Sequence, residues 1–225
     1  KDILRFHAVY WPAMLMAAGL TPPHRIFAHG WWTHDGEKMS KSLNNVVNPF
    51  ELIDTFGLDP VRYFLMREIP FGQDGDYSDA AMTQRINSDL ANDLGNLVQR
   101  VLSFIYKNAG AKIPEAGELL GADREMLAKA ASLHEVLRED MENQALQVYC
   151  QHIWEVIGEA NRYVDAQRPW SLKKSEDPKD IARMETVLYV LAEVIRHVAI
   201  YVQPLMPDSA SKILDQLGQT ERTFE

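Results

Sequence analysis

The feature that most constrains the fold is a helical repeat of apolar residues that begins near Ser78 and continues along the chain. Apolar side chains recur at steps of three and four residues, which places them on one face of an α-helix. An isolated helix leaves such a face in water, so several helices must pack together to bury their stripes. The sequence therefore predicts a bundle of four or five helices with connections at 110–121 and 169–178. The stripes are Ile86, Leu90, Leu94, Leu97, Val101 and Ile105; residues near 123–141; Leu146, Tyr149, Ile153, Val156, Ala160 and Tyr163; and Val187, Leu191, Val194 or Ile195, Val198 and Tyr201.

The first 36 residues show a different pattern. An apolar run over residues 6–20 predicts a helix, which Gly19 and the Pro22-Pro23 pair bring to an end. Residues 26–33 are rich in strand-forming types and lead to Asp35-Gly36, a strong tight-turn signal. A helix, a strand and a glycine turn are typical of the end of an α/β nucleotide-binding domain.

Residues 38–79 are irregular, but the same sequence pattern predicts two short helices within them. Asn48-Pro49 and Asp59-Pro60 each place a good N-cap residue before a proline at the first helical position. Gly57 is expected to end the first helix and Pro70 the second. The predicted fold class is therefore mainly α, with a small α/β part at its N-terminal end.

Charge and composition exclude several classes of protein. The chain has 225 residues and a net charge of −9, whereas a general nucleic-acid coat protein is broadly basic. An acidic protein nevertheless binds RNA where the contacts are few and selected by shape. No apolar run reaches the roughly 18 residues of a membrane span. The single cysteine, Cys150, excludes a disulfide framework and a multi-cysteine metal site, and we expect it to be a small core residue. We expect a cytoplasmic protein without a metal site.

The residues best suited to chemistry are Lys38-Met39-Ser40-Lys41-Ser42, which directly follow the predicted turn. Two lysines separated by a small hydroxyl residue, on a loop at the edge of an α/β domain, suit the stabilisation of negative charge on a triphosphate under attack. Lysine is a flexible point charge, unlike the planar fork of arginine. The alternative for the string alone is a solvated basic loop.

The string resembles the KMSKS signature of class I aminoacyl-tRNA synthetases, and its surroundings resemble methionyl-tRNA synthetases in particular. The resemblance covers essentially the whole chain and is densest over residues 1–100. The matching stretches are Lys1-Asp2-Ile3, Arg5-Phe6-His7, Tyr10-Trp11-Pro12-Ala13, His29-Gly30-Trp31-Trp32, residues 46–49, Arg62-Tyr63-Phe64-Leu65, Arg67-Glu68, Pro70-Phe71-Gly72, Asp74-Gly75-Asp76 and residues 90–97.

The resemblance implies a methionine–tRNA ligase, in which the methionine carboxylate attacks the α-phosphorus of ATP with Mg²⁺ and the methionyl group then passes to tRNA(Met). Lys38 and Lys41 correspond to the catalytic lysines that act on the triphosphate, with Ser40 in the same ATP-binding loop. Asp2 matches a residue that contacts the ATP ribose, although an N-cap of the following helix fits it equally well. The methionine pocket is implied to include Ile3, Phe6 and His7.

The resemblance also implies that the helical bundle recognises a CAU anticodon through Asn96, Arg100 and Trp170. Positions 96 and 100 are four apart and lie outside the Leu94–Leu97–Val101 stripe, so they are free to face a ligand. Asparagine and arginine can read base edges, and an exposed tryptophan can stack on a base. From the residues alone, a solvated polar face and a hydrophobic plug are the alternatives.

The implied domains are residues 1–36 as the end of a Rossmann-type catalytic domain, residues 37–80 as the KMSKS loop with a connecting, stem-contact region, and residues 81–225 as an anticodon-binding bundle. The HIGH motif and the zinc-binding insertion of the family do not occur in the sequence, so Zn²⁺ is expected only in a missing N-terminal half. We therefore expect the chain alone to be inactive. A stand-alone, non-catalytic anticodon-binding module is the alternative function.

The sequence departs from the usual pattern of the family at one position of the loop region. Asn44-Asn45 stands where the family usually has Gly-Asn after the KMSKS string and a leucine. Glycine in such a loop often adopts a left-handed backbone conformation, and asparagine is the best substitute for it. We therefore expect the loop to keep its shape.

Overall fold

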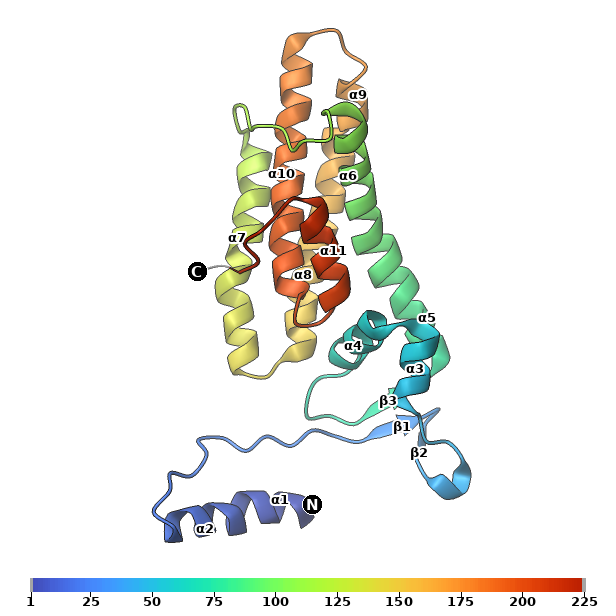
Figure 1. Cartoon of the computed structure of the whole chain (residues 1–225), viewed down its shortest axis with the longest axis vertical. Coiled ribbons are helices and arrows are strands. Elements are labelled where there is room, and N and C mark those ends of the chain that lie inside the picture. The colour runs from blue at the N-terminus through green and yellow to red at the C-terminus, as the bar shows by residue number, and fades with distance from the viewer. Residues whose placement is uncertain (1, 224–225) are drawn as a thin grey trace.

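The computed structural model describes residues 2–223 and is mainly α-helical. A long helical bundle carries a small sheet at one end, and a separate N-terminal helical segment lies beyond the sheet (Figure 1). The predicted mainly α fold class is confirmed. Within the described residues, no helix is both long and apolar enough to span a membrane.

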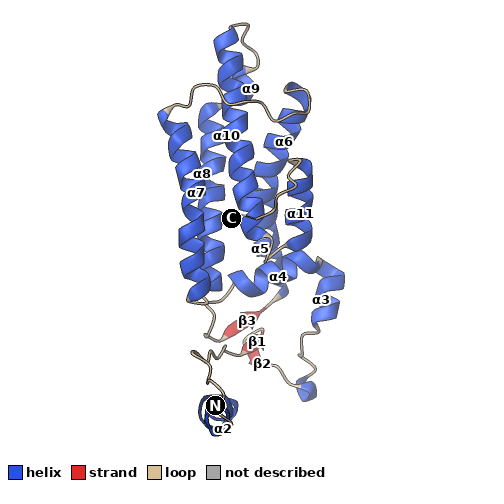
Figure 2. Ribbon diagram, turned by 60° about the vertical axis from the view of Figure 1, so that its left-hand side comes forward, coloured by secondary structure: helices blue, strands red, loops and turns tan. Residues whose placement is uncertain are grey.

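The bundle is built from one long broken helix together with α7, α8, α10 and α11 (Figure 2). The broken helix runs from α5 through a π-helical segment, η3, into α6 without an intervening loop. A short helix, α9, lies in the connection predicted at 169–178. The bounds are α5 Asp79–Arg85, η3 Ile86–Gly95, α6 Asn96–Asn108, α7 Gly121–Glu142, α8 Leu146–Gln167, α9 Pro169–Leu172, α10 Pro178–Val202 and α11 Pro207–Gln216.

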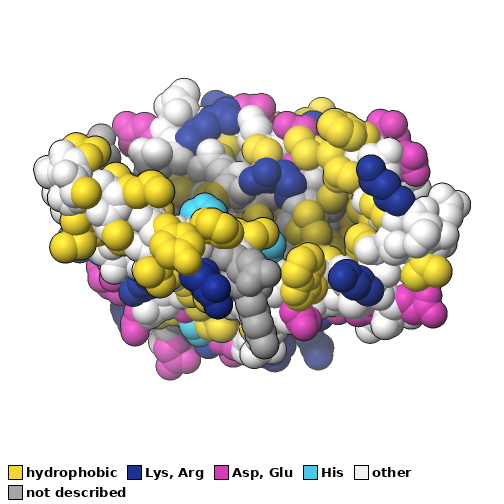
Figure 3. Space-filling model, turned by 90° about the horizontal axis from the view of Figure 1, so that it is seen from below, with side chains coloured by type: hydrophobic (Ala, Val, Ile, Leu, Met, Phe, Trp, Pro, Cys, Tyr) yellow, Lys and Arg dark blue, Asp and Glu magenta, His cyan; other side chains and the backbone are white. Residues whose placement is uncertain are grey.

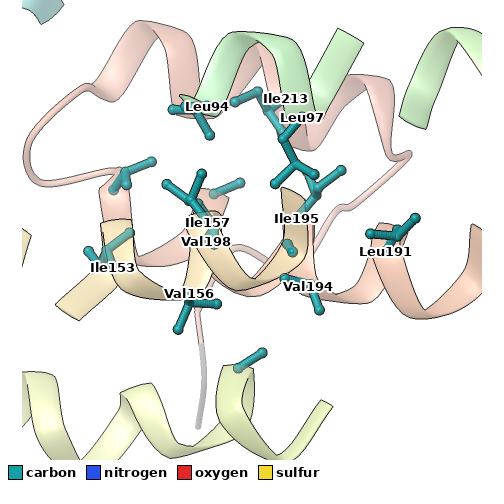
Figure 4. Close-up of a cluster of buried hydrophobic side chains, with 14 of the residues drawn as sticks. Leu94, Leu97, Ile153, Val156, Ile157, Leu191, Val194, Ile195, Val198 and Ile213 are labelled. Atoms are coloured by element: carbon teal, nitrogen blue, oxygen red, sulfur yellow. The ribbon is translucent and has the colours of Figure 1, made fainter. Parts of the chain in front are cut away.

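The predicted apolar stripes meet in a single core inside the bundle (Figure 4). Side chains from η3, α6, α8, α10 and α11 interdigitate there, and the burial of the stripe residues confirms the helical pattern. The stripe residues that are only half-buried lie at the ends of their stripes: Ile86, Leu90, Leu146 and Tyr201. Cys150 is fully buried, as expected, and burial raises the pKa of its thiol to about 12.

Glycine is required where η3 passes into α6. A Cβ atom on Gly95 would lie 2.9 Å from the carbonyl oxygen of Leu90, five residues earlier in the chain. That contact is closer than real Cβ atoms adopt, so any side chain at this position would displace the backbone. The π-helical turn therefore depends on Gly95, which immediately precedes Asn96.

The sheet has three strands in the order β2-β1-β3. β1 (Trp32–His34) and β2 (Glu37–Lys38) form an antiparallel hairpin whose predicted turn, Asp35-Gly36, has two positive φ angles. β3 (Gly75–Tyr77) pairs parallel to β1. The strand expected over 26–33 begins only at Trp32, because pairing with β3 extends no further towards the N-terminus.

The two short helices before the bundle are α3 (Pro49–Phe56) and α4 (Leu58–Arg67). The Asn48 side chain accepts a hydrogen bond from the Phe50 N–H, which confirms the predicted N-cap. The N-cap predicted at Asp59 is wrong, because α4 begins one residue earlier and Asp59 lies inside it. The Asp59 carboxylate instead accepts from the N–H groups of Asp208 (3.4 Å) and Ser209 (2.6 Å) and so caps α11, about 150 residues away in the chain.

The predicted N-terminal helix forms as α1 (Asp2–Arg5), a π-helical turn η1 (Phe6–Tyr10) and α2 (Trp11–Ala17). It ends near Gly19, which has a φ of +72°. Many of its apolar side chains are exposed, and the segment stands apart from the bundle in Figure 1. Hydrophobic side chains gather on this lobe when the molecule is seen from below (Figure 3).

A buried carboxylate joins three helices near the end of the bundle that lies opposite the sheet (Figure 1). Asp123 on α7 accepts two hydrogen bonds from Arg183 on α10 (2.5 and 2.7 Å) and one from the Tyr163 hydroxyl on α8 (2.5 Å). Its carboxylate also accepts from the Leu120 N–H at 2.8 Å and so caps α7. Burial opposes the charge, but these hydrogen bonds outweigh it and lower the pKa of Asp123 to about 2.

Asp123→Asn is expected to lower the free energy of unfolding by about 3 kcal/mol, because it leaves Arg183 partly buried without its counter-charge. A carboxylate whose pKa is depressed on folding stabilises the protein above its unfolded pKa, near 4, and loses that contribution as the pH falls towards 2. Urea unfolding at pH 7 and pH 3 measures both effects. The difference between wild type and variant should shrink at pH 3, and a difference independent of pH would contradict this assignment.

Candidate functional site

The KMSKS loop, residues 38–42, leaves the sheet at the end of β2. Lys41-Ser42-Leu43 form a single 3-10 turn, which the Ser40 hydroxyl caps by accepting from the Ser42 N–H at 3.3 Å. Ser40 Oγ also lies 2.7 Å from Ser42 Oγ. Both lysines, Lys38 and Lys41, are exposed. The loop therefore has a defined shape, with two cations free to approach an anion.

The two asparagines after the loop hold its shape. Asn44 has a φ of +52° and ψ of 32°, so the left-handed conformation expected at the departure from the family pattern is confirmed. The side chain of Asn45 closes the loop: its Oδ1 accepts from the Ser40 N–H at 2.7 Å, and its Nδ2 donates to the Lys38 carbonyl at 3.2 Å. The sequence alone does not predict this role of Asn45, because it depends on how the loop folds back on itself.

The hairpin that carries the loop is anchored from β3. Asp76 accepts from the Thr33 hydroxyl at 2.6 Å and from the Gly36 N–H at 2.8 Å, and these bonds hold the pKa of Asp76 below its usual range. Asp74 accepts from the Trp31 N–H at 2.8 Å. The Trp31 ring in turn lies 5.8 Å from Lys38 Nζ, within reach of a cation–π interaction. These carboxylates position the base of the loop.

Glycine allows the segment before β1 to approach β3. A Cβ atom on Gly30 would lie 2.1 Å from the carbonyl oxygen of Gln73. No side chain fits in that space, because the obstructing atom belongs to the backbone. Gly30 therefore permits the close contact that brings Trp31 alongside Asp74.

The residues implied for the methionine pocket lie on the N-terminal segment. Ile3 and Phe6 are 71% and 59% exposed, and the His7 side chain is also exposed. His7 Nδ1 lies 2.9 Å from the Ile3 carbonyl oxygen, and the Phe6 ring packs edge-on against Tyr10 at 5.4 Å between centroids. Asp2 begins α1, and its side chain lies outside the described part of the structure. These residues share one exposed segment and do not enclose a pocket by themselves.

The three residues implied for anticodon recognition gather at the other end of the molecule. The Arg100 guanidinium lies 5.2 Å from the centre of the Trp170 ring, and its Nη2 donates to Asp165 Oδ1 at 2.5 Å. Trp170 remains 37% exposed. Asn96, one helical turn before Arg100, is exposed, and its side chain makes no hydrogen bond to another described residue. The structure thus brings together an arginine, an aromatic ring and an unpaired amide.

A strained backbone position places Trp170. Arg168, the residue between α8 and α9, has a φ of +46° and ψ of 58°, which is unusual for a residue with a side chain. Pro169 then occupies the first position of α9, and its side chain is buried. This turn directs Trp170 back towards α6. Asp165 holds Arg100 in the cluster, and the sequence alone does not predict this role because the two residues lie 65 positions apart.

Two protein-family models match the chain. The model described as tRNA synthetases class I (M) matches residues 1–102, and the model described as anticodon binding domain of methionyl tRNA ligase matches residues 113–225.

Curated relatives and solved structures agree with these models. The chain is 55% identical to a methionine–tRNA ligase of Mycobacterium leprae, over 98% of this chain and 41% of that protein. It is 56% identical to one of Brucella suis, over 97% of this chain and 42% of that protein. A structure of Mycobacterium tuberculosis methionyl-tRNA synthetase in complex with methionyl-adenylate superimposes with a TM-score of 0.95 at 54% identity, over 97% of this chain and 43% of that one.

The chain therefore spans about two-fifths of the length of the relatives it matches. Within that span the matches in sequence and in backbone structure cover nearly every residue. The synthetase model contains the lysine loop and also Asn96 and Arg100, whereas the anticodon-binding model contains Trp170. This chain belongs to the methionyl-tRNA synthetase family of class I aminoacyl-tRNA synthetases.

Proposed function

We propose that this chain supplies the KMSKS loop and the anticodon-binding bundle of a methionine–tRNA ligase. The observation that carries the proposal is the presence of two separate ligand-facing sites on one scaffold. The exposed lysines of the KMSKS loop lie at the sheet end, and the Arg100–Trp170 cluster lies near α9 at the opposite end of the bundle (Figure 1). An enzyme that joins an amino acid to a long RNA needs both.

The proposed role of Lys38 and Lys41 is to stabilise negative charge on ATP. As the methionine carboxylate attacks the α-phosphorus, a P–O bond to that carboxylate forms and the bond to pyrophosphate breaks, so negative charge accumulates on the departing phosphates. Exposed lysine ammonium groups on a shaped loop can move onto these oxygens. Mg²⁺, which accompanies ATP in such reactions, would add further neutralisation of the same charge.

The proposed methionine and ribose contacts lie on α1 and η1. Asp2 is proposed to contact the ATP ribose, and Ile3, Phe6 and His7 are proposed to line the methionine pocket. Apolar and aromatic side chains suit a polarizable thioether, and the exposed apolar surface of this segment could pack against the remainder of a catalytic domain. In this view residues 1–36 end a Rossmann-type domain, residues 37–80 form the KMSKS loop and connecting region, and residues 81–225 form the anticodon-binding domain.

The proposed tRNA(Met) contact is made by Asn96, Arg100 and Trp170, which would read a CAU anticodon. Trp170 presents a partly exposed ring on which an unstacked base can lie, and Arg100 already sits against that ring. The free amide of Asn96 offers both a donor and an acceptor for a base edge. Cytoplasmic protein synthesis is the setting that such a reaction implies.

A polypeptide limited to these 225 residues is proposed to bind tRNA without activating methionine, because the family resemblance assigns the other half of the ATP site to the HIGH-containing segment. The alternative function, a non-catalytic anticodon-binding module, shares the bundle but has no need of the lysine loop. Retention of a loop shaped by Ser40, Asn44 and Asn45 favours the enzyme.

Binding to tRNA tests the anticodon assignment. The chain is expected to bind a tRNA with a CAU anticodon at least tenfold more tightly than the same tRNA with an altered anticodon. Trp170→Ala should remove most of this preference, since base–aromatic stacking contributes about 1–3 kcal/mol. Fluorescence anisotropy with labelled tRNA measures both affinities.

Tyr106→Ala is the matched control, because Tyr106 is an aromatic residue on α6 that is even more exposed than Trp170 and lies outside the cluster. It should leave the preference for CAU unchanged. Equal affinity of the folded wild-type chain for both tRNAs would show that the assignment of Asn96, Arg100 and Trp170 is wrong.

The loop assignment is tested in a full-length enzyme that contains this segment. Lys41→Ala is expected to slow methionyl-adenylate formation by about 10²–10³-fold, because one electrostatic contact to the transition state is lost. Pyrophosphate exchange measures this rate. The affinity for tRNA should change little, and Lys107→Ala, on α6, serves as a control. A rate that Lys41→Ala leaves unaltered would exclude the proposed catalytic role.

A further inference from the structure

A second basic site lies between α4, α7 and α8, away from both sites described above. An open cavity of about 590 Å³ is lined there by Arg67 from α4, Lys129 from α7, and Trp154, Gly158 and Arg162 from α8. The proposed reaction and the anticodon contact use none of these residues. The cavity therefore needs an explanation of its own.

Arg67 is a cation without a counter-charge. Within the described residues its side chain makes no hydrogen bond or ion pair, and its Nε is buried without a partner. The carboxylates near it are already occupied: Arg85 pairs with Glu68 at 2.7 Å and with Asp89 at 3.2 Å. Tyr63 also donates to Asp89, at 2.8 Å. A half-buried guanidinium with unused donors favours an external anion.

The other charges of the cavity leave a small positive excess. Lys129 and Arg162 share a single carboxylate, Glu159, at 3.8 and 2.8 Å. The remaining acid, Glu155, accepts a hydrogen bond from Gln151 at 3.2 Å. Three cations thus face two carboxylates in a chain whose net charge is −9. This local reversal of sign favours a negatively charged ligand.

Gly158 indicates that the ligand approaches the backbone. It lies in the middle of α8, where glycine destabilises a helix relative to alanine. Nothing within the described structure requires a glycine there, since a Cβ atom would meet only the end of the Arg162 side chain, at 3.7 Å. A bulky ligand that lies against α8 would account for the missing side chain.

The cavity lies on the helix face that leads to the anticodon cluster. Gly158, Arg162 and Asp165 are spaced four and three residues apart, so they share one face of α8. Asp165 holds Arg100, which packs on Trp170. Gly158 lies roughly 10 Å along the helix axis from Asp165, towards the end of the bundle that carries the sheet. Figure 1 shows α8 running from the α9 end of the bundle towards the end that carries the sheet. An RNA held at Trp170 and extending along this face of α8 towards the KMSKS loop would pass over the cavity.

We propose that this cavity binds a backbone phosphate of the tRNA, with Arg67 as the principal donor and Gly158 providing room for the RNA chain. The inference rests on the proposed function, because it takes tRNA as the ligand. Phosphate contacts carry no sequence information, so this site contributes affinity and orientation, whereas the Trp170 cluster contributes the choice of anticodon.

The test is a titration of the 225-residue chain with CAU tRNA at several salt concentrations. Arg67→Gln is expected to weaken binding roughly tenfold at low salt, equally for CAU and altered anticodons. The slope of log affinity against log salt should become shallower by about 0.7–0.9, the value for one phosphate contact. Arg138→Gln, which removes an arginine of α7 at a different cavity, should leave the slope unchanged.

Gly158→Ala separates a ligand-facing role from a structural one. It should raise the urea midpoint of unfolding, because alanine favours the helix, and yet weaken tRNA binding. This variant keeps the test decisive if Arg67→Gln folds poorly. Unchanged affinity of folded Gly158→Ala, together with an unchanged salt slope in Arg67→Gln, overturns the inference. If CAU preference persists in that case, the proposed anticodon function stands, whereas its absence from the wild-type chain would reject both.

Discussion

The arrangement of the two proposed sites depends on helix α4, which is anchored to the turn between α10 and α11. The Asp59 carboxylate accepts from the backbone N–H groups at the start of α11, and Arg62 donates to the carbonyl groups of Pro204 (2.6 Å) and Leu205 (3.1 Å) in the turn that follows α10. Backbone N–H groups at the start of a helix have no partners within that helix, so a carboxylate that accepts from them stabilises it. One short helix thereby caps α11 and holds the turn before it, both of which lie far from it in sequence.

The same helix belongs to two hydrophobic cores. Tyr63 is fully buried in the bundle, where its ring packs 4.4 Å from that of Trp154. Phe64, the next residue, is buried in a smaller core and contacts Trp32 and Tyr77 of the sheet. Because adjacent residues of a helix point about 100° apart, α4 can serve both cores at once. The hairpin that carries the KMSKS loop is therefore coupled to the bundle through packed side chains.

Much of the fold could be predicted because its signals are local. The apolar stripe of α8 follows from spacing alone, the N-cap at Asn48 from an adjacent proline, and the left-handed backbone at Asn44 from the conformational preference of one residue. The prediction at Asp59 is wrong because the hydrogen bonds of its side chain are not local. Its sequence context is that of a local cap, but the N–H groups it satisfies belong to a helix about 150 residues later in the chain. Likewise, the strand expected over 26–33 is short, because its length depends on a partner strand about 40 residues away.

The sequence by itself determined the helical periodicity, the tight turn at Asp35-Gly36, the lysine loop and the family resemblance, since each resides in neighbouring residues. Only the tertiary structure decided that Arg100 packs on Trp170, that Asn45 closes the loop, and that Arg67 is left without a carboxylate. These relationships join side chains from different elements. Their energies depend on distance and on which competing partners are already occupied, and neither quantity is contained in the local pattern of a single chain segment.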